Sequence, residues 1–207
     1  MIPKFGSETG LLLIDVQKGV NEFEHWGGGK TGRRNNPDAE KHMQSVLTAW
    51  RAADLPVFWT RHDSREAASP LKFSLPTGAQ IDGFDPAPED VVIEKDVNSA
   101  FVGTDMELRM RQRGVSRLVV MGFFTNFCVE TSVRMSGNMG YDTYLVQDAC
   151  ATCNRIGPDG TDYDPQVLHD ISVSNMNGEF CTAILATDAV ALIGADAIHL
   201  NRVQGNE

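Results

Sequence analysis

Three reactive side chains stand at or just after the ends of short apolar runs in the sequence. They are the carboxylate of Asp15, the ammonium of Lys95 and the thiol of Cys128. A thiol can attack a carbonyl carbon when a carboxylate takes its proton and a cation stabilises the negative charge nearby. Each of the three alone has an ordinary structural interpretation, since a free cysteine is commonly an inert core residue. Together, on successive strand ends, they indicate a nucleophilic site.

The position of Cys128 strengthens this interpretation. The sequence predicts a helix that begins at Thr125 and Asn126, so that Cys128 falls in its first turn. Unpaired N–H groups and the positive end of the helix dipole favour a thiolate there and can lower a cysteine pKa to about 3.5 to 7.5. A nearby Lys95 would act in the same direction. The sequence therefore predicts an activated thiolate.

The elements that position these residues follow from the hydrophobic pattern. Short apolar runs, rich in β-branched and aromatic residues, alternate with amphipathic stretches along the chain. Runs without polar alternation are typical of parallel strands buried on both faces. The pattern predicts an α/β fold, a three-layer doubly wound sheet of six parallel strands with helices on both faces, whose ligand crevice lies at the carboxyl ends of the strands. The predicted strands are 11–14, 55–60, 91–93, 118–121, 141–146 and 180–185.

Five helices are predicted between or after these strands, each beginning at a polar capping residue. Residues 104–107 have the pattern of a capping box. The helix that begins at Asp164 is expected to turn Val167, Leu168 and Ile171 toward the core. The predicted helices begin at Asn36, Thr104, Thr125, Asp164 and Thr187.

Two long stretches show little periodicity of either kind. Residues 62–90 are rich in proline and glycine and predict a long ordered loop, of the kind used for a lid or a subunit contact. Residues 21–35 contain three consecutive glycines and are interpreted as a flexible flap. Because each stretch follows a predicted strand, both are expected near the carboxyl edge of the sheet.

Composition narrows the class of protein. The 207 residues predict one domain spanning 1–207. A net charge of −10 disfavours nucleic acid and anionic membranes as partners. No apolar run is long enough to span a bilayer, and the start of the sequence lacks a secretory pattern, so a cytoplasmic protein with free thiols is expected. The long loop and the apolar last helix favour a homo-oligomer, a dimer or tetramer.

Three segments carry a resemblance to a known family. They are Leu13-Ile14-Asp15-Val16-Gln17, Lys95 with Ser99-Ala100-Phe101, and the run from Gly122 to Val129 with Thr131. The sequence resembles the isochorismatase-like cysteine hydrolases over nearly its whole length, and His62-Asp63-Ser64 with Ser69-Pro70-Leu71 is similar to one bacterial branch.

The resemblance implies a strand order of 3-2-1-4-5-6 and a catalytic triad of Asp15, Lys95 and Cys128. It implies hydrolysis of a small amide or ureido substrate through a thioester, with the N–H groups of Phe124 and Cys128 as an oxyanion hole. It also implies a cis peptide between Phe123 and Phe124. The residues expected to contact the substrate are Gln17, Phe23, Trp26, Phe101 and Thr125.

Two differences from family patterns bear on cofactors and chemistry. Nicotinamidase relatives hold a metal with an Asp-x-His pair and a further histidine, whereas here no second histidine follows His62 before Asp90, so neither a metal nor another cofactor is expected. Members that cleave the vinyl ether of isochorismate lack the cysteine. Cys128 therefore favours amide hydrolysis, with vinyl-ether hydrolysis as an alternative.

Other interpretations remain open at this point. The protein could be a noncatalytic α/β module that binds a small ligand or a protein partner. Cys150 and Cys153 have the spacing of a thioredoxin-type pair, and with His169 and Cys181 they could form a zinc site, although the spacings match no standard one. Unpaired thiols are the simpler interpretation. Nucleotide-dependent redox chemistry is disfavoured because no G-x-G-x-x-G follows the first strand.

Overall fold

In the computed structural model, which describes residues 4–194, six parallel strands form one sheet in the order β3-β2-β1-β4-β5-β8. β6 and β7 form a separate antiparallel hairpin, so β8 is the sixth strand of the main sheet and the predicted order is confirmed. The strands are β1 (Thr9–Ile14), β2 (Val57–His62), β3 (Val91–Lys95), β4 (Arg117–Phe123), β5 (Asp142–Ala151), β6 (Arg155–Ile156), β7 (Asp162–Tyr163) and β8 (Thr182–Ile184).

β1 is the centre of the sheet and is buried on both faces. All its residues are buried, and it pairs with β2 on one side and β4 on the other. Its continuous apolar sequence is what a central parallel strand requires, because neither of its faces meets water.

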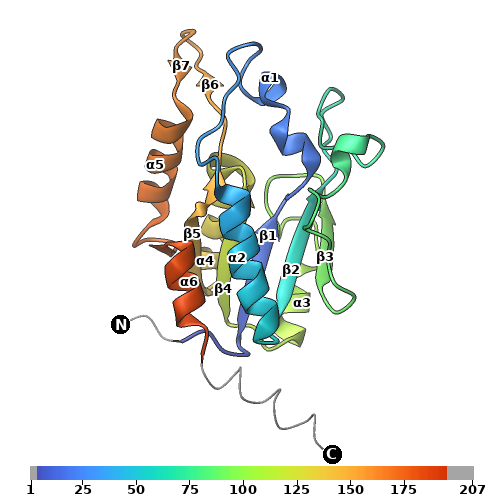
Figure 1. Cartoon of the computed structure of the whole chain (residues 1–207), viewed down its shortest axis with the longest axis vertical. Helices are drawn as coiled ribbons and strands as arrows, with labels where there is room; N and C mark the ends of the chain where they lie inside the picture. Colours follow the sequence, from blue (N-terminus) through green and yellow to red (C-terminus); the bar gives the residue numbers. More distant parts are fainter. Residues whose placement is uncertain (1–3, 195–207) are drawn as a thin grey trace, which may run out of the picture.

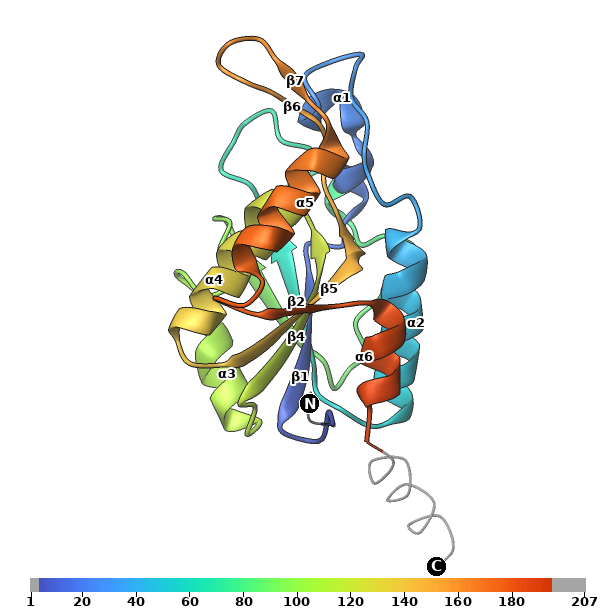
Figure 2. The ribbon, with the colours of Figure 1, turned by 90° about the vertical axis from the view of Figure 1, so that its left-hand side faces the viewer.

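Helices cover both faces of the sheet, as predicted. Figure 2 shows α2 and α6 on one side of the strands and α3, α4 and α5 on the other. The helices are α1 (Phe23–Trp26), α2 (Ala39–Ala52), α3 (Met106–Gln112), α4 (Glu130–Asn138), α5 (Pro165–Met176) and α6 (Ala186–Leu192). Within residues 4–194 none of them combines the length and the apolar character needed to cross a bilayer.

Several details of the predicted helices are wrong. The predicted start at Asp164 is confirmed, but α2 and α6 have Asp38 and Leu185 as their N-caps in place of Asn36 and Thr187. The capping box at 104–107 does not form, because Asp105 is the N-cap of α3 and the Thr104 hydroxyl accepts from the Met106 N–H (3.4 Å) while it donates to the carbonyl of Ala100. In α5, Val167 and Ile171 point outward and are 49% and 54% exposed. The helix is turned so that its buried face carries His169, which hydrogen-bonds to the loop after β4.

The two long stretches lie where the strands end, but only one has the predicted form. Residues 62–90 have little regular structure, as expected. Residues 21–35 are not a free flap, since they contain the single-turn helix α1 and are fastened by Asn154. Its side-chain amide donates to the Gly27 carbonyl (2.9 Å) and accepts from the Arg33 N–H (2.9 Å). Figure 1 shows α1 beside the β6–β7 hairpin at this end of the molecule.

Gly122 lets β4 approach β1 where both strands end. It pairs with Ile14, and a Cβ built on it would lie 2.2 Å from the Ile14 carbonyl oxygen. Its φ of 130° is a conformation that side chains other than glycine rarely adopt. The residue after Ile14 is also unusual, since Asp15 has a φ of 53°. The backbone therefore has a positive φ at the ends of β1 and β4, next to the segments that carry the reactive residues.

We expect Gly122→Ala to destabilise the fold more than Gly140→Ala. At Gly140 φ is 86° and no atom lies within 4 Å of a built Cβ. Alanine there should lower the unfolding free energy only by the strain of the left-handed conformation, about 1 to 2 kcal/mol. At Gly122 the backbone clash adds to a similar strain. Urea denaturation of the two variants tests this, and equal losses would contradict the close-approach role of Gly122.

Candidate active site

The three reactive residues singled out in the sequence meet at the carboxyl edge of the sheet, together with a fourth residue. Asp15 follows β1, Lys95 ends β3, and Cys128 lies in a single π-type turn, Thr125–Val129, that leads from β4 into α4. His62 ends β2, between β1 and β3. The Cys128 Sγ, a carboxylate oxygen of Asp15 and a ring nitrogen of His62 lie within 4.8 Å of one another.

His62 was not among the residues predicted for the site. The predicted second strand ended at residue 60, two residues short of His62. Its expected place between β1 and β3 was nevertheless a signal, because residues at its end must lie beside those that end its neighbours. The register confirms the relation, since His62 is paired with Lys95 across the two strands. Its side chain is 9% exposed.

Both carboxylate oxygens of Asp15 are held. Oδ1 accepts a hydrogen bond from the Thr60 hydroxyl (2.6 Å), and Oδ2 accepts one from Lys95 Nζ (2.7 Å). The backbone N–H of Asp15 donates to the Thr60 carbonyl (3.2 Å), which fixes the residue in its left-handed conformation. The carboxylate is therefore oriented before any ligand arrives.

Lys95 is the positive centre of the site. Its ammonium group has three acceptors within hydrogen-bond distance: Asp15 Oδ2 (2.7 Å), His62 Nδ1 (2.8 Å) and the Val97 carbonyl (3.1 Å). Burial alone would lower the pKa of Lys95, but the negative charge of Asp15 and contact with Cys128 outweigh this effect, and the net shift is upward. Lys95 is thus a charged, fully bonded ammonium in the interior.

Cys128 rests as a thiol, which corrects the expectation of an activated thiolate. Burial raises the pKa of Cys128, and the neighbouring Asp15 carboxylate raises it further, while Lys95 opposes both with a smaller effect. The cation and the helix start can be inferred from the sequence, whereas the burial of the thiol and the effect of the carboxylate on it depend on the fold. Sγ lies 3.8 Å from the Asn98 side-chain oxygen, to which the thiol can donate. Forming a thiolate here requires a group that takes the proton.

The turn that carries Cys128 is shaped by its neighbours. The peptide between Phe123 and Phe124 is cis, as the resemblance implied. The Phe124 carbonyl accepts from the N–H groups of both Phe127 (2.9 Å) and Val129 (3.2 Å), which closes the wide turn. Among the described residues, nothing accepts a hydrogen bond from the Phe124 N–H. The side chain of Thr125 contacts His169 Nδ1 (2.9 Å), so α5 supports the turn.

A cavity of about 230 Å³ opens onto Cys128. Apolar side chains, Trp26 among them, form part of its wall. The rest is formed by Cys128, Asn98 and polar groups from the long 62–90 loop and the β6 hairpin. The loop therefore contributes to the site of its own chain. The lining residues are Trp26, His62, Ser64, Glu66, Leu71, Asn98, Phe124, Phe127, Cys128 and Arg155.

Only some of the predicted substrate contacts line this cavity. Trp26 does, and so does Phe124, which was predicted for the oxyanion hole. The other four predicted contacts are engaged elsewhere. The side-chain amide of Gln17 bonds to the backbone of His62 and Gly78, and Thr125 bonds to His169. Phe23 lies under the Arg34 guanidinium, and Phe101 is buried in the core.

The described residues do not fit a metal ion at this site. Asp15, His62 and Cys128 each offer a possible ligand atom. However, Lys95 Nζ already donates hydrogen bonds to Asp15 Oδ2 and His62 Nδ1. Its positive charge would also repel a divalent cation placed between these two atoms. The Lys95 ammonium thus occupies the position that a metal ion would need.

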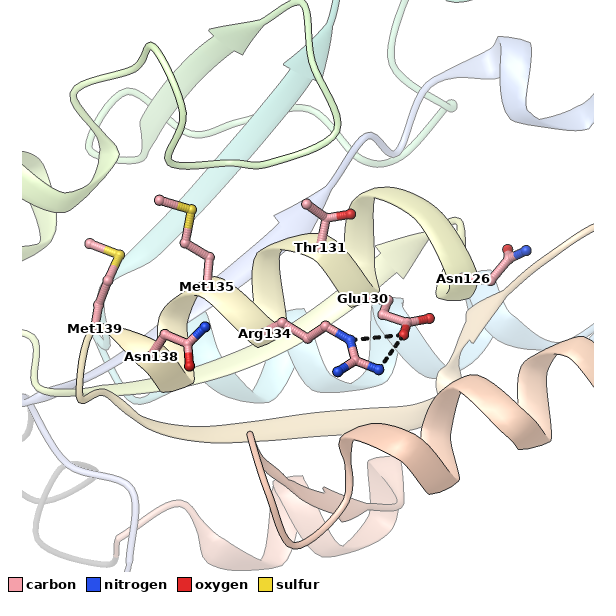
Figure 3. Close-up of a pocket in the computed structure, with 7 residues that line it drawn as sticks. All are labelled: Asn126, Glu130, Thr131, Arg134, Met135, Asn138 and Met139. Atoms are coloured by element: carbon pink, nitrogen blue, oxygen red, sulfur yellow. Dashed lines mark hydrogen bonds and ion pairs between the residues drawn. The ribbon is translucent and has the colours of Figure 1, made fainter.

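A larger cavity lies away from these residues. It has a volume of about 650 Å³ and runs along α4. Figure 3 shows Arg134 paired with Glu130, and Met135 and Met139 farther toward the C-terminal end of the helix. It contains neither a thiol nor a histidine, so the smaller cavity at Cys128 is the candidate active site. The larger cavity is lined by Asn126, Glu130, Thr131, Arg134, Met135, Asn138 and Met139.

Comparison with known proteins identifies the class. The sequence matches the Isochorismatase domain family over residues 9–188. It is 36% identical over 178 residues to YrdC, an uncharacterized isochorismatase family protein of Bacillus subtilis, covering 86% of this chain and 91% of that one. A crystal structure of an isochorismatase-family protein from Chromobacterium violaceum superposes with a TM-score of 0.84 at 36% identity, covering 92% and 96% of the two chains. The chain belongs to the isochorismatase family of hydrolases.

Two relatives have names that state an activity. Nicotinamidase 3 of Arabidopsis thaliana is 30% identical over 166 residues, covering 70% of this chain and 74% of its own. Ureidoacrylate amidohydrolase RutB of Agrobacterium fabrum is 36% identical over 81 residues, covering 39% of this chain and 34% of its own.

We expect Asp15→Asn to speed alkylation of Cys128. The carboxylate raises the pKa of the thiol and Lys95 lowers it, so removing only the carboxylate leaves the cation to favour the thiolate. Iodoacetamide should then modify Cys128 faster than in the wild-type protein at neutral pH, as followed by peptide mass spectrometry. Slower modification would contradict the charge balance described here.

The buried ion pair should show strong coupling in stability. Lys95→Met alone leaves the Asp15 carboxylate buried without its cation, which should cost about 3 to 5 kcal/mol of unfolding free energy. Adding Asp15→Asn removes the stranded charge and should recover a large part of that loss. Urea denaturation of both single variants and the double variant measures the coupling, and additive losses would contradict it.

Proposed function

We propose that this protein is a cysteine-dependent amidohydrolase that cleaves a C–N bond of a small amide or ureido substrate through a thioester. The observation that carries the proposal is the grouping of Asp15, Lys95 and Cys128, with the Cys128 thiol lining a small cavity. A thiol that is protonated at rest, beside an oriented carboxylate, suits a nucleophile whose proton is removed as it attacks.

In the first half of the reaction Asp15 acts as base and then as acid. It takes the proton from Cys128 Sγ while the sulfur attacks the carbonyl carbon, and a tetrahedral oxyanion forms. The protonated Asp15 then gives this proton to the substrate nitrogen. The C–N bond breaks, ammonia or an amine departs, and the acyl group remains on sulfur as a thioester.

In the second half Asp15 activates water. The carboxylate takes a proton from water as the oxygen attacks the thioester carbon, and the C–S bond then breaks. Asp15 returns the proton to sulfur, which restores the thiol and releases the acid product. Lys95 is paired with the Asp15 carboxylate (2.7 Å) and stabilises negative charge nearby. General acid–base catalysis of this kind is typically worth about 10² to 10⁴-fold.

The oxyanion is assigned to backbone donors. The N–H of Phe124, which has no acceptor among the described residues, and the N–H of Cys128 are the proposed pair. Two N–H groups directed at a developing oxyanion stabilise the transition state more than the neutral carbonyl of the substrate.

The cavity limits the substrate to a small molecule. Its volume of about 230 Å³ lies below the usual range of ligand pockets, about 300 to 1,000 Å³. Aromatic walls suit a planar group, and polar side chains at the cavity suit a second polar group on the substrate. The amidohydrolase and nicotinamidase named among the relatives support C–N hydrolysis as the reaction type.

A screen of small primary amides and ureido acids for ammonia release tests the proposal. We expect turnover by the wild-type protein and a loss of at least about 10⁴-fold in Cys128→Ala and Cys128→Ser, with the fold intact by circular dichroism. Cys181→Ala, which changes a buried thiol outside the cavity, is the matched control and should retain activity. Hydrolysis that survives in Cys128→Ala would overturn the mechanism, and ligand binding without turnover would favour a noncatalytic module.

A further inference from the structure

His62 is a buried polar residue that the proposed mechanism leaves without a role. It ends β2, its side chain lines the cavity, and one ring nitrogen belongs to the cluster formed with Asp15 and Cys128. It lies in the same cavity wall as the reactive thiol, so a polar group on its ring can contact whatever binds there.

The protonation pattern of His62 follows from Lys95. An ammonium group has three hydrogens, and each of the three acceptors around Lys95 can take one. His62 Nδ1 therefore accepts, which places the single ring hydrogen of the neutral imidazole on Nε2. Burial lowers the pKa of His62, the Asp15 carboxylate opposes this, and Lys95 lowers it again, so the neutral ring is favoured.

The Nε2–H of His62 is the ring donor that no described residue accepts from. Nδ1 faces Lys95, and among the described residues nothing accepts a hydrogen bond from Nε2. Because the side chain lines the cavity, the unused N–H is available to a ligand there. A donor whose tautomer is already fixed loses little freedom when it binds an acceptor.

We propose that His62 is a substrate-binding residue that presents Nε2–H as a neutral hydrogen-bond donor to an oxygen of the substrate close to the reacting carbon. The residue acts as a donor and not as a proton source, because losing the Nε2 proton would leave an imidazolate. It therefore selects substrates with an acceptor oxygen at that position. The inference rests on the proposed function for the nature of the ligand, an amide.

Two isosteric variants separate the two ends of the ring. The side-chain oxygen of His62→Asn can replace Nδ1 and accept from Lys95, but it leaves no donor at the position of Nε2. The longer His62→Gln can place its NH₂ near the position of Nε2. A role in binding substrate predicts rescue by glutamine, whereas a role only in holding Lys95 predicts rescue by asparagine.

The test uses alkylation of Cys128 by two probes, so it does not depend on turnover. Iodoacetamide carries an amide oxygen close to the reacting carbon, and iodomethane carries none. Dividing the two rate constants cancels any change in thiol pKa. We expect the ratio to fall about 2- to 10-fold in His62→Asn, the range for one neutral hydrogen bond, and to be largely kept in His62→Gln. An unchanged ratio in His62→Asn, or an equal fall in both variants, would overturn the proposal.

A measurement on the wild-type protein guards against variants that fail to fold. Long-range ¹H–¹⁵N spectra of histidine-labelled protein report which ring nitrogen carries hydrogen. We expect the Nε2–H tautomer for His62 at neutral pH. An Nδ1–H tautomer or an imidazolium would overturn the proposal, while the separate amide screen decides whether the protein hydrolyses amides at all.

Discussion

The candidate site depends on one buried ion pair, between the Lys95 ammonium and the Asp15 carboxylate, at 2.7 Å and with both side chains at most 1% exposed. Two charges in the interior are tolerated only when their remaining bonding capacity is met. Here Thr60 satisfies the second oxygen of the carboxylate, and His62 and a backbone carbonyl satisfy the rest of the ammonium. The strand order is what makes this possible, because it brings the ends of β1, β2 and β3 together at one edge.

This ion pair also decides the state of the nucleophile. With Lys95 and Asp15 charged, a neutral Cys128 leaves the buried group without net charge, whereas a thiolate would add an uncompensated negative charge. Moving the proton from Cys128 to Asp15 keeps the total charge the same, so the attack on a carbonyl can proceed without creating a new buried charge. A high thiol pKa at rest is therefore compatible with the proposed cysteine chemistry, since the base is adjacent.

The sequence predicted the architecture well. Continuous apolar runs indicate strands buried on both faces, and the polar residues that follow them indicate the carboxyl edge of the sheet, where the candidate site lies. Asp15, Lys95 and Cys128 could be found this way, and the family resemblance supplied the strand order. The features that were predicted wrongly depend on contacts between residues far apart in the sequence. Local pattern indicated that Val167 and Ile171 face inward, but contact between His169 and Thr125 turns α5 the other way. Gln17 was expected to meet substrate, yet its amide binds backbone that only the folded loop brings near.

A neutral Cys128 thiol rests beside the charged carboxylate of Asp15 and the charged ammonium of Lys95. This arrangement can be checked by the ultraviolet absorbance of the thiolate, recorded against pH as the difference between wild-type protein and Cys128→Ala. We expect no thiolate signal from Cys128 at neutral pH and its appearance only above the ordinary pKa range of a cysteine. A full thiolate signal at neutral pH would contradict it.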